Sequence, residues 1–87
     1  MTDNAKADIE YWKLKNQIKI IKRINLLLED ILRNPSKGIG KPEALRYELS
    51  GYWSRRINNE HRILYSFSDN IITVYSLRYH YKELPSQ

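Results

Sequence analysis

A strongly amphipathic stretch over residues 18–32 limits the folds open to this chain more than any other feature. Its apolar residues recur at spacings of three and four, which is the period of one helix face. These residues are Ile20, Ile21, Ile24, Leu27, Leu28, Ile31 and Leu32. A helix with such a stripe needs another layer to cover it, so the rest of the chain is expected to supply a sheet.

A weaker helical pattern precedes this stretch over residues 2–15. Its apolar residues recur at spacings of four and three, and polar residues that commonly cap helices stand at positions 2–4. The polar pair at residues 16–17 separates the two helices. Pro35 ends the second one, because proline disfavours helical geometry in the residue before it. Residues 1–33 are therefore expected to form a helical hairpin.

The second half of the chain has the pattern of strands and turns. The expected strands cover residues 52–57, 61–67 and 71–79, with turns at 58–60 and 68–70. Residues 34–51 are expected to be a loop that carries Glu43, with residues 46–50 as either a short turn or the approach to the first strand. Residues 82–87 are expected to be a tail. We predict a single α+β domain over residues 1–87, with two N-terminal helices packed on an antiparallel β-meander at 52–81.

The charge balance favours an anionic partner. The chain has 15 Lys and Arg residues against 10 Asp and Glu, a net charge of +5. Nucleic acid is the first candidate, an acidic protein the second and an anionic membrane the third. The chain has no cysteine, so disulfides and zinc–thiolate sites are excluded. With no apolar run long enough to span a bilayer and no signal peptide, we expect no membrane association and a cytoplasmic protein.

Arginine and tyrosine concentrate in the second half. Arginine suits bidentate phosphate recognition, and tyrosine rings offer platforms for unstacked RNA bases. Only one or two of these tyrosines are expected to meet a ligand, the rest being core; they are Tyr47, Tyr52, Tyr65, Tyr75, Tyr79 and Tyr81. Because strand residues alternate, Arg55 and Arg56 point to opposite faces of the sheet. One of them must then be paired or reach past the core edge, since an unpaired buried charge is strongly unfavourable. A solvated basic strand is an equally good explanation of this stretch alone.

Few side chains can perform acid–base chemistry. Glu43 lies in the expected loop, where its carboxylate can project over the sheet, and the two histidines are His61 and His80. A histidine near a strand end is more often structural than catalytic. No metal-binding cluster, phosphate-binding loop or nucleophile elbow is present, so we predict no metal and no cofactor. Two functions remain open: metal-free RNA cleavage by attack of the 2′-hydroxyl, and binding of RNA without cleavage. From these features alone, binding without cleavage is favoured.

The string GKPEALRYELSGYWSRRINNEHRILY at residues 40–65, with RYHY at 78–81, resembles the YoeB/Txe-type toxins of the RelE superfamily. The resemblance extends back through IEYWKLKN and IIKRIN in the helical hairpin and covers nearly all of residues 5–81. It implies the toxin of a type II toxin–antitoxin system, an mRNA endoribonuclease that acts at the A site of the translating ribosome.

The resemblance also implies residue roles. Glu43 would be the general base, Arg62 the cation that stabilises the reacting phosphate and His80 the general acid. The residues expected to position the substrate or to bind RNA, phosphate or the ribosome are Arg46, Arg55, Arg56 and Tyr81. Arg46 stands where the family commonly has lysine; it can hold a phosphate but is too weak an acid to donate a proton readily.

The resemblance further implies partners. A cognate antitoxin, acidic, partly disordered and of the YefM/Phd-like or Axe-like kind, would silence the toxin, and operator DNA would be bound indirectly through it. A homodimer is compatible with the family. Family members usually begin with a short apolar strand, whereas residues 1–4 lead almost directly into the first helix. Either the start lies further upstream or the sheet lacks that strand, which could leave a central strand as an exposed edge.

Overall fold

The computed structural model describes residues 1–78, so the expectations for His80, Tyr81 and the tail at 82–87 lie outside the described residues. The helices are α1 (Asp3–Leu14) and α2 (Ile18–Arg33), with a short 3₁₀ helix, η1, at Tyr47–Leu49. The strands are β1 (Glu43–Ala44), β2 (Trp53–Arg56), β3 (Arg62–Ser68) and β4 (Ile71–Ser76). They form one antiparallel sheet in the order β1-β2-β3-β4.

The two helices begin and end where the local chemistry requires it. The Thr2 hydroxyl caps α1 by accepting a hydrogen bond from the Ala5 amide at 3.2 Å. Asn16 takes a left-handed backbone conformation with φ 55°, which asparagine tolerates better than most residues and which turns the chain between the helices. The backbone is extended again at Asn34, the residue before Pro35.

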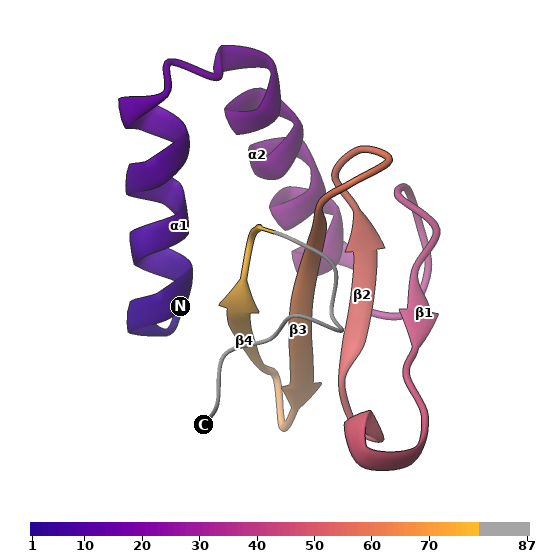
Figure 1. Ribbon diagram of the computed structural model, residues 1–87. Helices are drawn as coiled ribbons and strands as arrows, with labels where there is room; N and C mark the ends of the chain where they lie inside the picture. Colours follow the sequence, from indigo (N-terminus) through magenta and orange to yellow (C-terminus); the bar gives the residue numbers. More distant parts are fainter. Residues whose placement is uncertain (79–87) are drawn as a thin grey trace.

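The helices and the sheet enclose one apolar core. Figure 1 shows α2 passing behind the sheet and α1 lying beside β4. Ile24, Leu27 and Ile31 from the α2 stripe are fully buried, together with Ile63 and Tyr65 on the facing side of β3. The predicted α+β class, with two N-terminal helices packed on an antiparallel sheet, is therefore confirmed.

The loop expected over residues 34–51 contains two short regular elements, of which only β1 lies outside the turn allowed at residues 46–50. Glu43 and Ala44 pair with Ser54 and Trp53 to form β1, and residues 47–49 form η1. A strand of two residues is too short to show a periodic pattern in the sequence. It forms because it pairs with a strand that begins ten residues later. Glu43 is thus fixed to the edge of the sheet rather than carried on a free loop.

Helix α1 is joined to β4 and to the residue after it through backbone atoms. The Thr2 amide donates to the Val74 carbonyl at 3.0 Å, and the Thr2 hydroxyl donates to the Tyr75 carbonyl at 3.0 Å. Further along the helix, Asp8 accepts a hydrogen bond from the Leu77 amide at 2.9 Å, and the Trp12 indole donates to the Leu77 carbonyl at 3.0 Å. Among the described residues no strand precedes α1. The hydrogen bonds from Thr2 instead reach the carbonyls of β4, the last strand in the order of the sheet.

Candidate active site

The strand register gathers the predicted base and two of the predicted arginines on one face of the sheet. Glu43 pairs with Ser54, and Arg56, two residues after Ser54 on the same face, pairs with Arg62. Directly paired side chains in an antiparallel sheet have Cβ atoms about 4.5–5.5 Å apart, and diagonal neighbours about 7–8 Å. Glu43, Arg56 and Arg62 therefore form a contiguous group on the face opposite to the helices.

The two arginines of this group differ in how they are held. Arg62 Nη1 donates to the Asn58 carbonyl at 2.7 Å and to the His61 carbonyl at 3.1 Å, which folds the side chain over the β2–β3 turn. The Asn58 side chain fixes that turn by accepting hydrogen bonds from the amides of Glu60 and His61. Both hydrogen bonds that Arg62 donates within residues 1–78 come from Nη1, whereas Nη2 and Nε donate none to the described residues. Arg56 is exposed at the end of β2.

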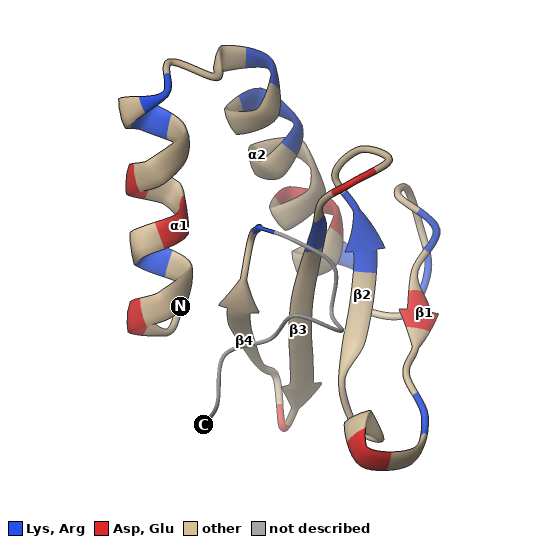
Figure 2. Ribbon diagram, in the orientation of Figure 1, with Lys and Arg blue, Asp and Glu red and all other residues tan. Residues whose placement is uncertain are grey.

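Charge of both signs meets at this edge of the sheet. Figure 2 shows the acidic residue of β1 beside the basic end of β2 and the basic start of β3. A shallow hollow of about 230 Å³ adjoins Glu43. Its lining consists of Glu43, Ala44, Leu45, Arg46, Tyr47 and Leu49. An exposed carboxylate next to exposed guanidinium groups can accept a proton while the cations hold an anionic group such as a phosphate.

Arg55 does not belong to this surface, and its predicted contact with RNA is corrected. Its side chain is 0% exposed on the helix-facing side of β2 and ion-pairs with Asp30 at 2.5 Å. Because strand residues alternate, one of the two adjacent arginines is predicted to be paired or to reach past the edge of the core. Arg55 is the paired one. Neither Asp30 nor Tyr65, which completes its surroundings, was expected from the sequence, although Asp30 stands directly before a residue of the α2 stripe.

His61 is part of the core rather than of the reactive face. Its ring packs edge-on against Trp12, with ring centroids 4.8 Å apart. Desolvation by burial lowers the pKa of His61 below its ordinary value, with the Glu60 carboxylate opposing that effect. The structural interpretation of this histidine therefore fits its surroundings, and the predicted general acid His80 and the predicted positioning residue Tyr81 lie outside the described residues.

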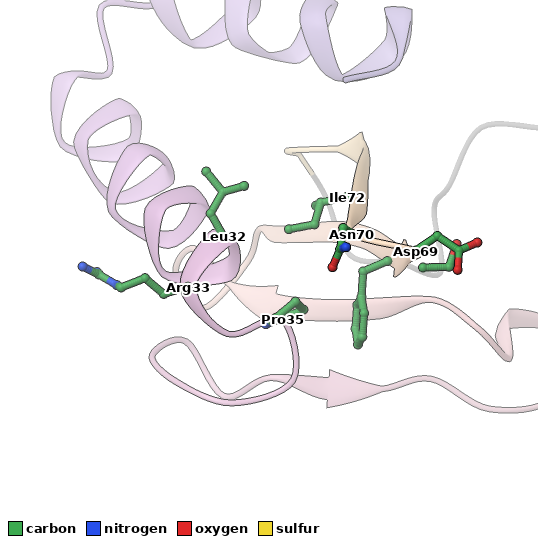
Figure 3. Close-up of a pocket in the computed structure, with 8 residues that line it drawn as sticks. Leu32, Arg33, Pro35, Asp69, Asn70 and Ile72 are labelled. Carbon is green, nitrogen blue, oxygen red and sulfur yellow. The ribbon is translucent and has the colours of Figure 1, made fainter.

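A larger cavity of about 660 Å³ lies on the other face of the sheet, between the end of α2 and the β3–β4 turn. Figure 3 shows Leu32 and Pro35 on one side and Ile72 with the Asp69-Asn70 turn on the other. This cavity contains none of the predicted site residues. Within residues 1–78 no group of three or more His, Cys, Asp or Glu residues could hold a metal ion. None of the described helices is long and apolar enough to cross a membrane.

Comparison with known proteins places this geometry in a family. Residues 1–81 match a family model described as the YoeB-like toxin of bacterial type II toxin–antitoxin systems. The Synechocystis toxin YoeB is 54% identical over 71 residues, which cover 82% of this chain and 83% of that protein.

Solved structures agree with the sequence match. YoeB from Staphylococcus aureus, 48% identical, superposes with a TM-score of 0.82 over 92% of both chains and has been solved both in a heterotetrameric complex with YefM and as a dimer. A YoeB/ParE toxin from Agrobacterium tumefaciens, 39% identical, gives a TM-score of 0.84 over 92% of this chain and 94% of that one. The chain that places Glu43, Arg56 and Arg62 on one face of its sheet therefore belongs to the YoeB-like toxins of bacterial type II toxin–antitoxin systems.

Proposed function

We propose that this toxin is a ribosome-dependent mRNA endoribonuclease that works in the cytoplasm by metal-independent acid–base chemistry. The observation that supports this most directly is the register that sets Glu43 on the same face as Arg56 and Arg62. A protein that only binds RNA needs the arginines but has no need of a carboxylate among them.

The proposed reaction is an internal transesterification. Glu43 takes the proton of the 2′-hydroxyl, and the freed oxygen attacks the adjacent phosphorus atom. Arg62 and Arg56 stabilise the negative charge that develops on the phosphoryl oxygens. His80 donates a proton to the departing 5′ oxygen, and Tyr81 positions the phosphate. One P–O bond forms as another breaks, so the products carry a 2′,3′-cyclic phosphate and a 5′-hydroxyl.

The antitoxin is proposed to be an acidic, partly disordered protein that covers this basic face. The YoeB–YefM heterotetramer from S. aureus supports a partner of the YefM kind. The dimer of the same toxin supports a homodimer for this chain in the absence of antitoxin. Operator DNA would be contacted chiefly through the antitoxin.

Binding of RNA or the ribosome without cleavage is the second candidate. It is favoured by the exposure of Arg46 and Arg56, which makes both available to phosphate groups. The two candidates differ in what the removal of one carboxylate does: a binder gains affinity for RNA when Glu43 is neutralised, whereas the nuclease loses its base.

The deciding experiment measures cleavage of a defined mRNA on stalled ribosomes by the wild type and by Glu43→Gln. We expect cleavage to fall by about 10²–10⁴-fold, the usual contribution of a general base, while ribosome binding stays nearly unchanged. Glu48→Gln is the matched control, because Glu48 is an exposed carboxylate on the neighbouring η1. His80→Ala tests the acid in the same assay.

Discrete cuts in the A site with 5′-hydroxyl ends, lost in Glu43→Gln and kept in Glu48→Gln, would support the nuclease. A folded wild type that binds ribosomes and makes no cut would support the binding module instead.

A further inference from the structure

The buried side chain of Arg55 lies at the centre of a polar network that holds residues 34–40, the segment that leads to Glu43. All five N–H groups of the guanidinium donate hydrogen bonds, which satisfies every donor that an arginine has. The acceptors are Tyr65 Oη at 3.1 Å, Asp30 Oδ2 at 2.5 Å, and the carbonyls of Ile39 at 3.2 Å, Asn34 at 2.6 Å and Lys37 at 2.9 Å. Three of these five acceptors are backbone atoms of one loop.

Asp30 and Tyr65 fasten the same loop independently of Arg55. Asp30 Oδ2 accepts from the Ile39 amide at 3.0 Å, and the Tyr65 hydroxyl donates to the Pro35 carbonyl at 2.6 Å. The hydrogen bond from Arg55, followed by that from the Ile39 amide, lowers the pKa of Asp30, so its carboxylate is ionised at neutral pH. Burial raises the pKa of Tyr65, so its hydroxyl keeps the proton that it donates. We call these three side chains and their loop partners the Arg55 network.

The loop fits so closely around the network that glycine is required at Gly38. Its φ is +132°, and a Cβ atom there would stand 1.9 Å from Asp30 Oδ2 and 3.0 Å from Arg55 Nη1. The loop then leaves the network at Gly40, whose carbonyl accepts from the Arg56 amide at 2.7 Å. Three residues later Glu43 pairs with Ser54 along the same edge of β2.

We infer that the Arg55 network positions Glu43: it fixes the approach of residues 34–40 and so sets the register in which Glu43 meets Arg56 and Arg62. Arg55 and Tyr65 are positioning residues and touch no substrate. Strand β2 thereby carries Arg56 on the face of the proposed substrate, and Arg55 on the opposite face, where it holds the loop that leads to Glu43. The inference rests on the proposed function for its effect on activity, but its structural part stands without it.

The test uses two variants that disturb the network by different routes. Tyr65→Phe removes the hydroxyl that links Arg55 to Pro35 while it keeps the ring in the core, and Gly38→Ala places a methyl group against Asp30. Ile24→Val is the matched control, since Ile24 is fully buried on α2 and takes no part in the hydrogen bonds of the network. All proteins are assayed at a temperature where circular dichroism shows them folded.

Two measurements are made on each protein. The first is single-turnover cleavage on saturating ribosomes, where we expect a loss of about 10–100-fold in the network variants and little change in Ile24→Val, because small misplacements of a reacting group are costly. The second is amide hydrogen exchange at Ile39, which bonds to Asp30, and at Leu45, which bonds to the Tyr52 carbonyl. Exchange at both amides should accelerate at least about tenfold in the network variants relative to the control.

The outcomes separate the two claims. A wild type that does not cut RNA defeats the proposed function, and the exchange rates still decide the positioning role. If the wild type cuts and Tyr65→Phe cuts as fast as Ile24→Val, the positioning role is refuted. Unchanged exchange at Leu45 in both network variants would refute it as well, since Glu43 would then be held without the network.

Discussion

Tyr47 combines an exposed ring with a left-handed backbone conformation, and replacing it by glycine should raise stability and weaken RNA binding. Its side chain is 85% exposed, so it contributes little to the core, and its backbone has φ 58° in the left-handed region. A bulky residue is rare in that region. It also lines the hollow next to Glu43 and Arg46. Of the tyrosines whose position is described, Tyr47 is the one best placed to stack on an unpaired base.

The magnitudes follow from the backbone and from stacking. The left-handed conformation costs an L-residue about 1–2 kcal/mol, and glycine avoids that cost but loses about 0.5–1 kcal/mol through its freedom in the unfolded chain. Tyr47→Gly should therefore raise the free energy of unfolding by up to about 1.5 kcal/mol, or Tm by up to roughly 12 °C for a domain of this size. Stacking of one base on an aromatic ring contributes about 1–3 kcal/mol, so RNA affinity should fall by roughly 5–150-fold.

The assays are urea denaturation and fluorescence anisotropy with a short labelled single-stranded RNA, applied to the wild type, Tyr47→Gly and Tyr47→Phe. Tyr47→Phe keeps both the strain and the ring, so both quantities should stay near the wild-type values. A less stable Tyr47→Gly protein would show that the backbone conformation is not strained. Unchanged RNA affinity would show that Tyr47 is not a platform, whatever its effect on stability.

Three further predictions concern the contacts made by α1. Burial raises the pKa of Asp8, so the folded state binds a proton more tightly than the unfolded chain does. The free energy of unfolding should therefore fall as pH rises above the ordinary value of 3.8. Asp8→Asn should remove this part of the pH dependence, measured by urea denaturation across pH 3–7. Burial lowers the pKa of His61 below 6.5, so stability should fall as pH drops through that value, and His61→Phe should flatten the fall in the same titration. Trp12→Phe leaves the buried Leu77 carbonyl without its indole donor and should cost about 1–3 kcal/mol of unfolding free energy by the same method.

The sequence predicts the elements of this fold better than it predicts their partners. The α2 stripe and the alternating strands identify the two layers, because helical and strand periods are local properties of the chain. The strand β1 and the burial of Asp8 escape prediction, because each depends on a partner outside its own segment of the chain. Glu43 needs Ser54 opposite it, and Asp8 needs the amide of Leu77.

The candidate site shows the same division. Alternation correctly separates Arg55 from Arg56, and it states that one of them must be compensated. It does not say which, because the compensating carboxylate comes from α2, 25 residues earlier. The resemblance to a toxin family assigned both arginines to RNA, and only the surroundings of Arg55 reveal that it serves the protein interior.

The attachment of α1 to the end of the sheet sets an order for the assembly of the molecule. The hydrogen bonds that Thr2, Asp8 and Trp12 make with Tyr75 and Leu77 span 65 to 73 residues of chain, so they rank among the most non-local contacts of the described residues. During synthesis, at about 5–20 residues per second, the first helix emerges several seconds before the strand that receives it. The helix that is made first therefore completes its contacts late, once β4 and Leu77 have left the ribosome that made the toxin.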